Sequence, residues 1–124
     1  QGKMIYIDFL GPWCPPCLAE MEPLKELRKK YSTDDIVFIS ICRNDDRERY
    51  EQVLDKYGMH VDGIEHIHAD DLQAESQVHK MYNQLNIDGI PYFFIINREG
   101  VIVNYGSMMR PSYPGTAECI EEWL

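Results

Sequence analysis

Residues 4–17 read MIYIDFLGPWCPPC and join an apolar run to two closely spaced cysteines. The run MIYIDFL is rich in β-branched and aromatic side chains, which predicts a buried strand over Met4–Leu10 in a parallel or mixed sheet. Pro15 and Pro16 suit the first turn of a helix, where a missing N–H costs little. Cys14 is therefore expected between a buried strand and the beginning of a helix.

The rest of the chain alternates between strand and helix patterns. Apolar residues at helical spacing continue to Tyr31, with a kink expected at Pro23. Further strands are predicted at Ile36–Cys42, Ile64–His68, Tyr92–Ile96 and 101–105, a turn at 97–100, and helices at 45–57, 72–85 and 116–124. This order predicts one α/β domain over residues 1–124, with a mixed central sheet and helices on both faces.

A Cys-x-x-Cys pair at the beginning of a helix is suited to redox chemistry. Unpaired backbone N–H groups and the helix dipole favour negative charge there, which raises the thiolate fraction of Cys14. Cys17 falls in the first turn, within reach of Cys14. Cys14 can then attack a partner's disulfide, and Cys17 resolves the mixed disulfide.

Two other uses of the pair are less well supported. A zinc site needs a second ligand pair, and the sequence holds no other Cys-x-x-Cys and no His-x-x-x-His. His66 and His68 are interpreted as solvated surface. A structural disulfide would not require two prolines and a helix N-terminus. No metal or other cofactor is expected. Cys42, an alternative third redox cysteine, and Cys119 are interpreted as core thiols.

Charge and hydropathy exclude some classes of partner. The chain has 21 acidic and 12 basic residues and a formal net charge of -9, which argues against a nucleic-acid-binding surface. No apolar run approaches the roughly 20 residues that span a bilayer. Any membrane attachment is therefore expected through an anchor outside this chain. The first residue is Gln1 rather than Met, so we expect a domain excised from a longer chain.

Two separated motifs resemble the thioredoxin-fold thiol–disulfide oxidoreductases. IDFLGPWCPPC (7–17) resembles the active-site strand and turn of that superfamily, and DGIPYFFIINREG (88–100) resembles its cis-proline strand and hairpin. The segments CLAEM (17–21), 60–71 and VNYGSMMRPS (103–112) resemble the bacterial TlpA/ResA-like members in particular. The resemblance covers essentially the whole chain. It implies a thioredoxin fold and an exported parent protein, whose usual strand upstream of Met4 is missing here.

The resemblance also implies roles for the residues around the cysteines. Cys14 would be the nucleophile and Cys17 the resolving, more buried thiol. The substrate-binding surface would include Trp13, Pro15, Pro16, Ile90 and Pro91. Of these, Pro91 would follow a cis peptide bond, and Ile90 would offer backbone groups to an extended partner segment.

Asp8 would be the buried carboxylate below the cysteines. Burial would raise its pKa, and it could take the proton of Cys17 as that thiol attacks. A buried polar group with no catalytic role is the alternative. Thioredoxin itself has a lysine near this carboxylate, where the closest residue here is Ser40. The family's helix proline usually stands at the position of Glu22, so the kink is expected to shift by one residue.

The function expected from these observations is reduction of disulfides in extracytoplasmic proteins, in a bacterial periplasm or cell envelope. Its partners would be protein disulfides and an upstream thiol reductant. Pro15 and Pro16 have no N–H, so they stabilise a Cys14 thiolate less than a donor-rich loop would, which favours a reductase. A disulfide oxidase or isomerase and a non-catalytic binding module remain alternatives. A peroxide-reducing enzyme would need a different Pro-Thr-rich loop, which is not found.

Overall fold

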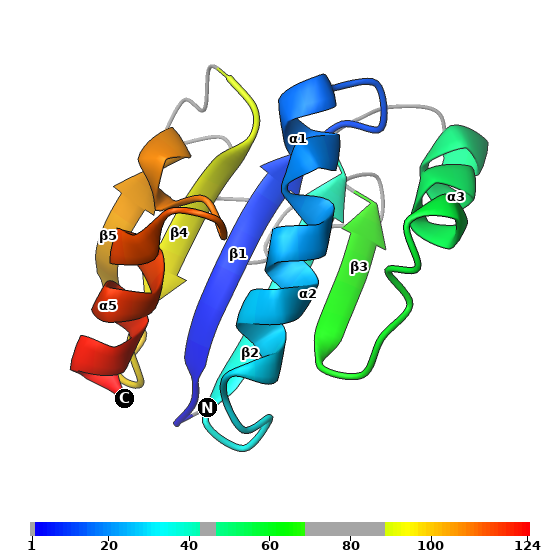
Figure 1. Cartoon of the computed structure of the whole chain (residues 1–124). Helices are drawn as coiled ribbons and strands as arrows, with labels where there is room; N and C mark the ends of the chain where they lie inside the picture. Colours follow the sequence, from blue (N-terminus) through cyan, green and yellow to red (C-terminus); the bar gives the residue numbers. More distant parts are fainter. Residues whose placement is uncertain (1, 43–46, 69–88) are drawn as a thin grey trace.

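The computed structural model of the chain describes residues 2–42, 47–68 and 89–124, and contains a five-stranded mixed sheet (Figure 1). The strands run in the order β3-β2-β1-β4-β5. β1, β2 and β3 are parallel, whereas β4 is antiparallel to β1 and β5 is antiparallel to β4. Their bounds are Met4–Leu10 (β1), Ile36–Cys42 (β2), Ile64–His68 (β3), Tyr92–Ile96 (β4) and Ile102–Gly106 (β5). The predicted mixed sheet is confirmed.

The central strand β1 separates two apolar clusters. Successive side chains of a strand point to opposite faces, so Tyr6, Asp8 and Leu10 share one face and Ile7 and Phe9 the other. The larger cluster packs on the Tyr6 face. A smaller cluster on the opposite face is formed by Ile7, Phe9, Ile41, Phe94 and Ile96.

The described helices pack on the Tyr6 face (Figure 1). They are α1 (Pro15–Ala19), α2 (Met21–Lys29), α3 (Arg47–Lys56) and α5 (Pro114–Trp123), with a short 3-10 helix, η2, at Ser107–Met109. Each α-helix contributes at least one side chain to the larger cluster: Cys17, Leu24, Tyr50, Leu54 and Ile120 are among them. The predicted helix over 72–85 lies outside the described residues.

The helix that follows the cysteines is broken rather than continuous. α1 ends at Ala19 and α2 begins at Met21, with Glu20 between them at φ -92° and ψ 0°. Pro23 has no N–H to donate to the carbonyl of Ala19, and its ring crowds that carbonyl. The expected kink is therefore confirmed. It lies at Glu20, three residues before the proline and next to the Ala19 carbonyl that lacks its helical hydrogen bond.

The last strand and the last helix begin at residues slightly different from those predicted. The last strand begins at Ile102 instead of residue 101, because the side-chain oxygen of Asn97 accepts the Val101 N–H at 2.9 Å. That N–H is consequently used in the turn and not in the sheet. The last helix begins at Pro114 instead of residue 116, since proline suits the first helical position.

Candidate functional site: a disulfide at the end of the central strand

Cys14 and Cys17 form a disulfide where the chain leaves β1 and enters α1. Their Cα atoms are 5.2 Å apart. The two residues are almost equally buried, with 4% and 3% of their surface exposed. The expected difference in burial between the two cysteines is therefore absent, because both pack in the larger apolar cluster.

Cys14 is the N-cap of α1, and its sulfur is the capping acceptor. The backbone N–H of Cys17 donates to Cys14 Sγ with an N–S distance of 3.3 Å. An N-cap side chain accepts from the second or third helical residue. The second residue here is Pro16, which has no N–H. Cys17 thus supplies the single first-turn donor that can reach the sulfur.

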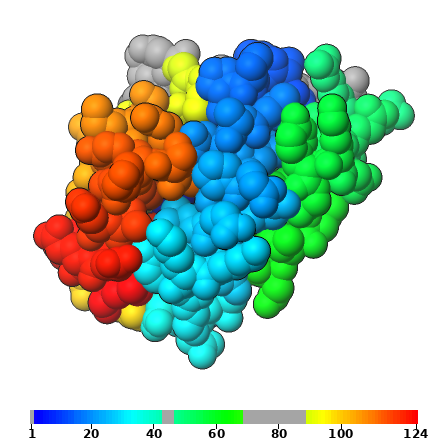
Figure 2. Space-filling model, viewed as in Figure 1, coloured from blue at the N-terminus to red at the C-terminus, as the bar shows by residue number. Residues whose placement is uncertain are grey.

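The segment that precedes β4 lies beside the disulfide. The Ile90–Pro91 peptide bond is cis, as the sequence predicted, and the carbonyl oxygen of Ile90 lies 3.9 Å from Cys14 Sγ. Figure 2 shows the segment around residues 89–92 in yellow next to the blue N-terminal segment that contains α1. Residues far apart in the sequence are therefore brought together at this end of the sheet.

The surface around the disulfide is partly apolar and exposed. Trp13 is 50% exposed, Pro15 and Pro16 are exposed, and Pro91 is half-buried. The Trp13 ring and the Ile90 side chain both lie over Gly11: a Cβ atom there would be 3.0 Å from each. Gly11 was not recognised from the sequence, although a glycine just before a functional turn indicates close packing.

Asp8 lies on the Tyr6 face of β1 and is 6% exposed. Burial raises the pKa of its carboxyl group to about 7, which confirms the predicted direction. Ser40 pairs with Asp8 in the strand register, and its hydroxyl lowers that pKa, although not enough to offset burial. Ser40 Oγ nevertheless lacks a hydrogen-bond partner of good geometry, so its contact with Asp8 is weak.

The interpretation of His66 and His68 as solvated surface is wrong. His68 is 3% exposed, and His66 is half-buried with its Nε2 atom 2.7 Å from the carbonyl oxygen of Met59. The ring of Tyr50, from α3, packs near both imidazoles. The reason for the error is that α3 and the chain that follows it cover the β3 edge of the sheet.

The other two cysteines lie outside the disulfide. Cys42 is fully buried at the end of β2, in agreement with its interpretation as a core thiol. Cys119 is half-buried in α5, and burial raises the pKa of its thiol. Within residues 2–42, 47–68 and 89–124, no group of three or more metal-binding side chains occurs.

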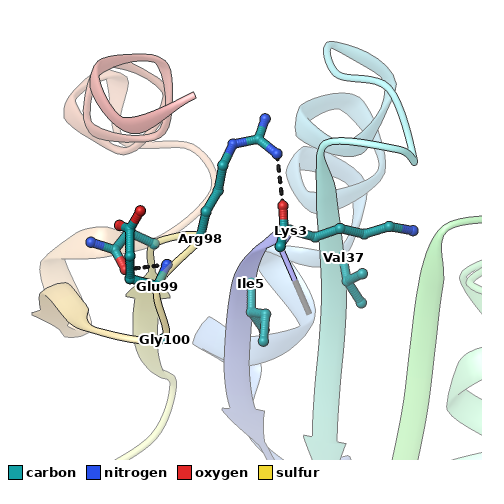
Figure 3. Close-up of a pocket in the computed structure, with 8 residues that line it drawn as sticks. Lys3, Ile5, Val37, Arg98, Glu99 and Gly100 are labelled. Carbon is teal, nitrogen blue, oxygen red and sulfur yellow. Dashed lines mark hydrogen bonds between the residues drawn. The ribbon is translucent and has the colours of Figure 1, made fainter.

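A cavity of about 450 Å³ lies at the opposite end of the sheet from the disulfide (Figure 3). It is bordered by the beginning of β1, by Val37 and by the turn of residues 97–100. Arg98 points across it and donates to the carbonyl oxygen of Gly2 at 2.8 Å. This cavity contains no cysteine and is separate from the redox site.

Comparisons with known protein families agree with the fold and with the paired cysteines. The profile of the thioredoxin-like family matches residues 2–102, and the chain belongs to that family. None of the described helices is long and apolar enough to cross a membrane.

Several relatives are named for thiol–disulfide chemistry. The thiol-disulfide oxidoreductase ResA of Halalkalibacterium halodurans is 26% identical over 129 residues, which is 100% of this chain and 62% of the relative. The ResA of Bacillus subtilis is 22% identical over 83% of this chain and 52% of the relative. The chain thus spans between half and two thirds of these curated relatives.

Solved structures of similar fold carry the same description. A Bacteroides vulgatus protein assigned as a thiol-disulfide oxidoreductase superposes with a TM-score of 0.79 at 30% identity, over 100% of this chain and 80% of that one. A second B. vulgatus structure with that assignment is 35% identical with a TM-score of 0.72, over 98% and 74%. The redox class predicted from the sequence is therefore that of the relatives.

Proposed function

We propose that this chain is a thiol–disulfide oxidoreductase that reduces disulfides of partner proteins outside the cytoplasm. The observation that carries the proposal is the Cys14–Cys17 disulfide between β1 and α1, with the Ile90 carbonyl beside it. Cys14 and Cys17 are three residues apart in the sequence, so the bond between them closes only a small ring. The names of the relatives support the same chemistry.

The reduced form starts the cycle, and Cys14 is the attacking group. The Cys14 thiolate attacks one sulfur of the partner's disulfide, which forms a mixed disulfide and releases a partner thiolate. Cys17 then loses its proton and attacks Cys14 Sγ. This step forms the Cys14–Cys17 bond, releases the second partner thiol and transfers two electrons to the partner. An upstream dithiol returns the pair to the reduced form.

Asp8 is the proposed proton acceptor for Cys17. A carboxyl group with a pKa of about 7 can take up and release a proton near neutral pH. Asp8 and Leu10 share one face of β1, and Leu10 and Cys17 belong to the same buried cluster. The carboxyl group is therefore on the side of the sheet where Cys17 is buried.

The partner is proposed to bind as an extended segment across the exposed side of the disulfide. Trp13 and Ile90 would contact its side chains, and Pro15, Pro16 and Pro91 would border it. The exposure of Trp13 supports this role, because with the exposed Pro15 and Pro16 it forms an apolar surface next to the disulfide.

Location outside the cytoplasm is the second part of the proposal. Exposed protein disulfides persist mainly in oxidising compartments, which is where a dedicated reductase has substrates. One structure of this fold is described as a secreted disulfide oxidoreductase of Mycobacterium tuberculosis. Fractionation of cells that express the full-length gene product would test the compartment, and recovery of that product in the cytosol would contradict it.

An insulin-reduction assay with dithiothreitol as the reductant tests the activity. The wild type should precipitate insulin chains faster than dithiothreitol alone, and Cys14→Ser should be no faster than the reductant. Cys119→Ser is the matched control, since that thiol lies in α5 outside the disulfide. A wild type that is no faster than dithiothreitol alone would contradict the reductase and favour a binding module with idle thiols.

A trapping experiment tests the order of attack. Cys17→Ala should accumulate a mixed disulfide between Cys14 and a disulfide-containing peptide, because the resolving thiol is missing. Cys14→Ala should accumulate much less of such an adduct. Equal trapping by both variants would contradict the assignment of Cys14 as the nucleophile.

A further inference from the structure

Three polar residues lie side by side across the parallel part of the sheet. Asp8 pairs with Ser40, and Ser40 pairs with His66, in the registers of β1–β2 and β2–β3. Register partners of neighbouring strands point to the same face. We call Asp8, Ser40 and His66 the polar row. It crosses the face of the sheet that is otherwise packed with apolar side chains.

Tyr50, from α3, covers the polar row. Its ring centroid is 6.5 Å from that of His66. Burial raises the pKa of its hydroxyl group, the charge of Asp8 raises it further, and the Ser40 hydroxyl lowers it. The phenol packs in the apolar cluster on the same face of the sheet as the polar row.

Three buried polar atoms on and above the row have no hydrogen-bond partner within the described part of the chain. They are Ser40 Oγ, Tyr50 Oη and His66 Nδ1. Ser40 is 1% exposed and Tyr50 is 2% exposed. An unpaired buried polar group destabilises the folded state, so a cluster of three is not expected from packing alone. Such groups occur where ordered water or a proton-transfer function uses them.

The hydrogen bond of His66 determines which of its nitrogens can accept a proton. Nε2 lies 2.7 Å from the carbonyl oxygen of Met59, which can only accept, so Nε2 carries a hydrogen and donates it. In the neutral ring Nδ1 is then a bare acceptor. The burial of His66 lowers its pKa and favours this neutral form.

The outer end of the row leads to the solvent. The ring of His60 lies 5.9 Å from that of His66, and His60 is exposed. His60 Nε2 is 3.2 Å from an Asp55 carboxylate oxygen and 3.8 Å from one of Glu51. A proton that reaches His66 is therefore next to a hydrated, acidic part of the surface.

We propose that Ser40, Tyr50 and His66 form a buried proton route between Asp8 and the solvent at His60. The route rests on the proposed function, in which Asp8 takes the proton of Cys17. After the Cys14–Cys17 bond has formed, Asp8 holds that proton. The hydroxyl groups of Ser40 and Tyr50, with ordered water between them, pass a proton to His66 Nδ1, and Asp8 becomes ionised again. The resulting imidazolium becomes neutral when its Nε2–H leaves the Met59 carbonyl and gives its proton to water beside His60.

The reverse direction serves the recovery of the reduced pair. A dithiol reductant attacks the Cys14–Cys17 bond and supplies two electrons, and Cys17 leaves as a thiolate. Asp8 protonates this thiolate and is itself reprotonated through the route. Each full cycle thus moves one proton in and one proton out and leaves the row unchanged.

The titratable and charged groups on the neighbouring elements must be kept constant in a test. Burial raises the pKa of Tyr6 on β1, and the charges of Asp8 and of Glu20, at the α1–α2 junction, raise it further. The cysteine pair lies on α1, and Tyr50 and Glu51 lie on α3. On β4, the register partner of Asp8 is the apolar Phe93.

The experiment is oxidation of the reduced protein by a disulfide-containing peptide, followed by stopped-flow tryptophan fluorescence in H₂O and D₂O. Tyr50→Phe removes only a hydroxyl group, and Ser40→Ala only an oxygen atom. Each should slow the second, resolving phase at pH 7 by about a hundredfold, the lower end of general acid–base contributions. Each should also increase the solvent isotope effect. Added imidazole should restore part of the rate.

Two controls separate a proton route from a packing effect. Tyr31→Phe removes a phenol that donates to Glu121 in α5 at 2.9 Å, away from the row, and should leave the rate and isotope effect unchanged. In an Asp8→Asn background, Tyr50→Phe should have no further effect. The proposal would be overturned if Ser40→Ala and Tyr50→Phe kept the wild-type rate and isotope effect. It would also be overturned if Tyr50→Phe slowed the Asp8→Asn variant as much as it slows the wild type.

A ¹³C NMR titration of the Asp8 carboxyl group in the oxidised protein gives a readout that needs no activity. Ser40→Ala should raise its midpoint, because the Ser40 hydroxyl lowers the pKa of Asp8, whereas Tyr31→Phe should not move it. An unchanged midpoint in Ser40→Ala would contradict contact along the row. A wild type that cannot exchange with any disulfide would instead refute the proposed function.

Discussion

The backbone N–H of Cys17 donates to the sulfur of Cys14, whereas the preceding residue, Pro16, has no hydrogen to donate. The two N-cap donors that a helix normally offers are thus reduced to one. A sulfur that loses a donor loses stabilisation of its thiolate form. Because the reduced pair carries that thiolate, its stabilisation sets how strongly the pair oxidises or reduces its partners.

Replacing Pro16 with alanine should make the pair more oxidising. The new N–H at the second helical position can donate to the Cys14 thiolate. We expect a less negative reduction potential, by about 30 mV for a tenfold change in the equilibrium constant. Equilibration with glutathione or dithiothreitol buffers measures it. Pro15→Ala is the matched control, since the first helical N–H does not point at the cap, and a shift as large there would contradict the argument.

The wild-type potential tests the direction of the proposed reaction. With a single first-turn donor on Cys14, the potential should lie nearer to roughly -270 mV than to -120 mV. The same redox buffers measure it. A value above about -180 mV would show that the protein is a disulfide oxidase or isomerase.

Ionisation of Asp8 should reduce stability as the pH rises. The folded state holds the Asp8 proton up to a pKa of about 7, whereas the unfolded chain releases it near 3.8, so the folded state binds more protons between these values. The free energy of unfolding therefore falls through that window. The difference corresponds to roughly 4 kcal/mol as an upper limit.

The Asp8→Asn variant should not show this fall in unfolding free energy as the pH rises. Urea denaturation of the oxidised proteins from pH 4 to pH 8 should show the variant matching the wild type at the acid end and exceeding it at pH 8. Asp34→Asn, at an exposed site, should follow the wild-type curve. The difference in unfolding free energy between the wild type and Asp8→Asn should therefore change with pH. A difference that stays constant would rule out a buried carboxyl group that titrates in this range.

Gly11→Ala should disturb partner binding without altering the disulfide. The new Cβ would lie 3.0 Å from Ile90 Cδ1 and from the Trp13 ring, so both side chains must shift. We expect a several-fold higher KM for insulin with little change in the reaction with a small disulfide. Gly89→Ala is the control, because a Cβ there meets nothing within 4 Å. Equal effects of the two substitutions would exclude specific packing over Gly11.

Glu20 joins the helix break to the C-terminal part of the chain. Its carboxylate accepts from the N–H of Ser112 at 2.9 Å and from its hydroxyl at 2.7 Å. Glu20→Ala should destabilise the protein by about 1.5–3 kcal/mol, the range for hydrogen bonds to a charged group. Glu26→Ala, which removes an exposed ion pair with Lys29, should cost less than about 1 kcal/mol in the same thermal unfolding experiment.

The sequence predicts the strands well because their signals are local. Four strands have the predicted bounds, including Met4–Leu10, where almost every residue is buried. The resemblance to thioredoxin also placed Ser40 near Asp8, and the two residues are register partners of β1 and β2. The cysteine pair is recognisable from its position between a strand and a helix.

The features that escape prediction depend on contacts between distant elements. His66 and His68 alternate with other residues in an apparent edge strand, and nothing local indicates that Tyr50 and Met59 cover them. The bond between Glu20 and Ser112 spans 92 residues. The equal burial of Cys14 and Cys17 depends on packing around the disulfide that only the folded chain supplies.

Arg98 holds the two ends of the described chain close together at one end of the molecule. Its guanidinium donates to the carbonyl oxygens of Gly2 and Leu124 and pairs with Asp35, while the disulfide lies at the other end of β1 (Figure 1). A tether or fused tag attached at either terminus would consequently lie away from the surface around the disulfide. Immobilising the protein on a bead through such a tag should therefore preserve its access to large substrates.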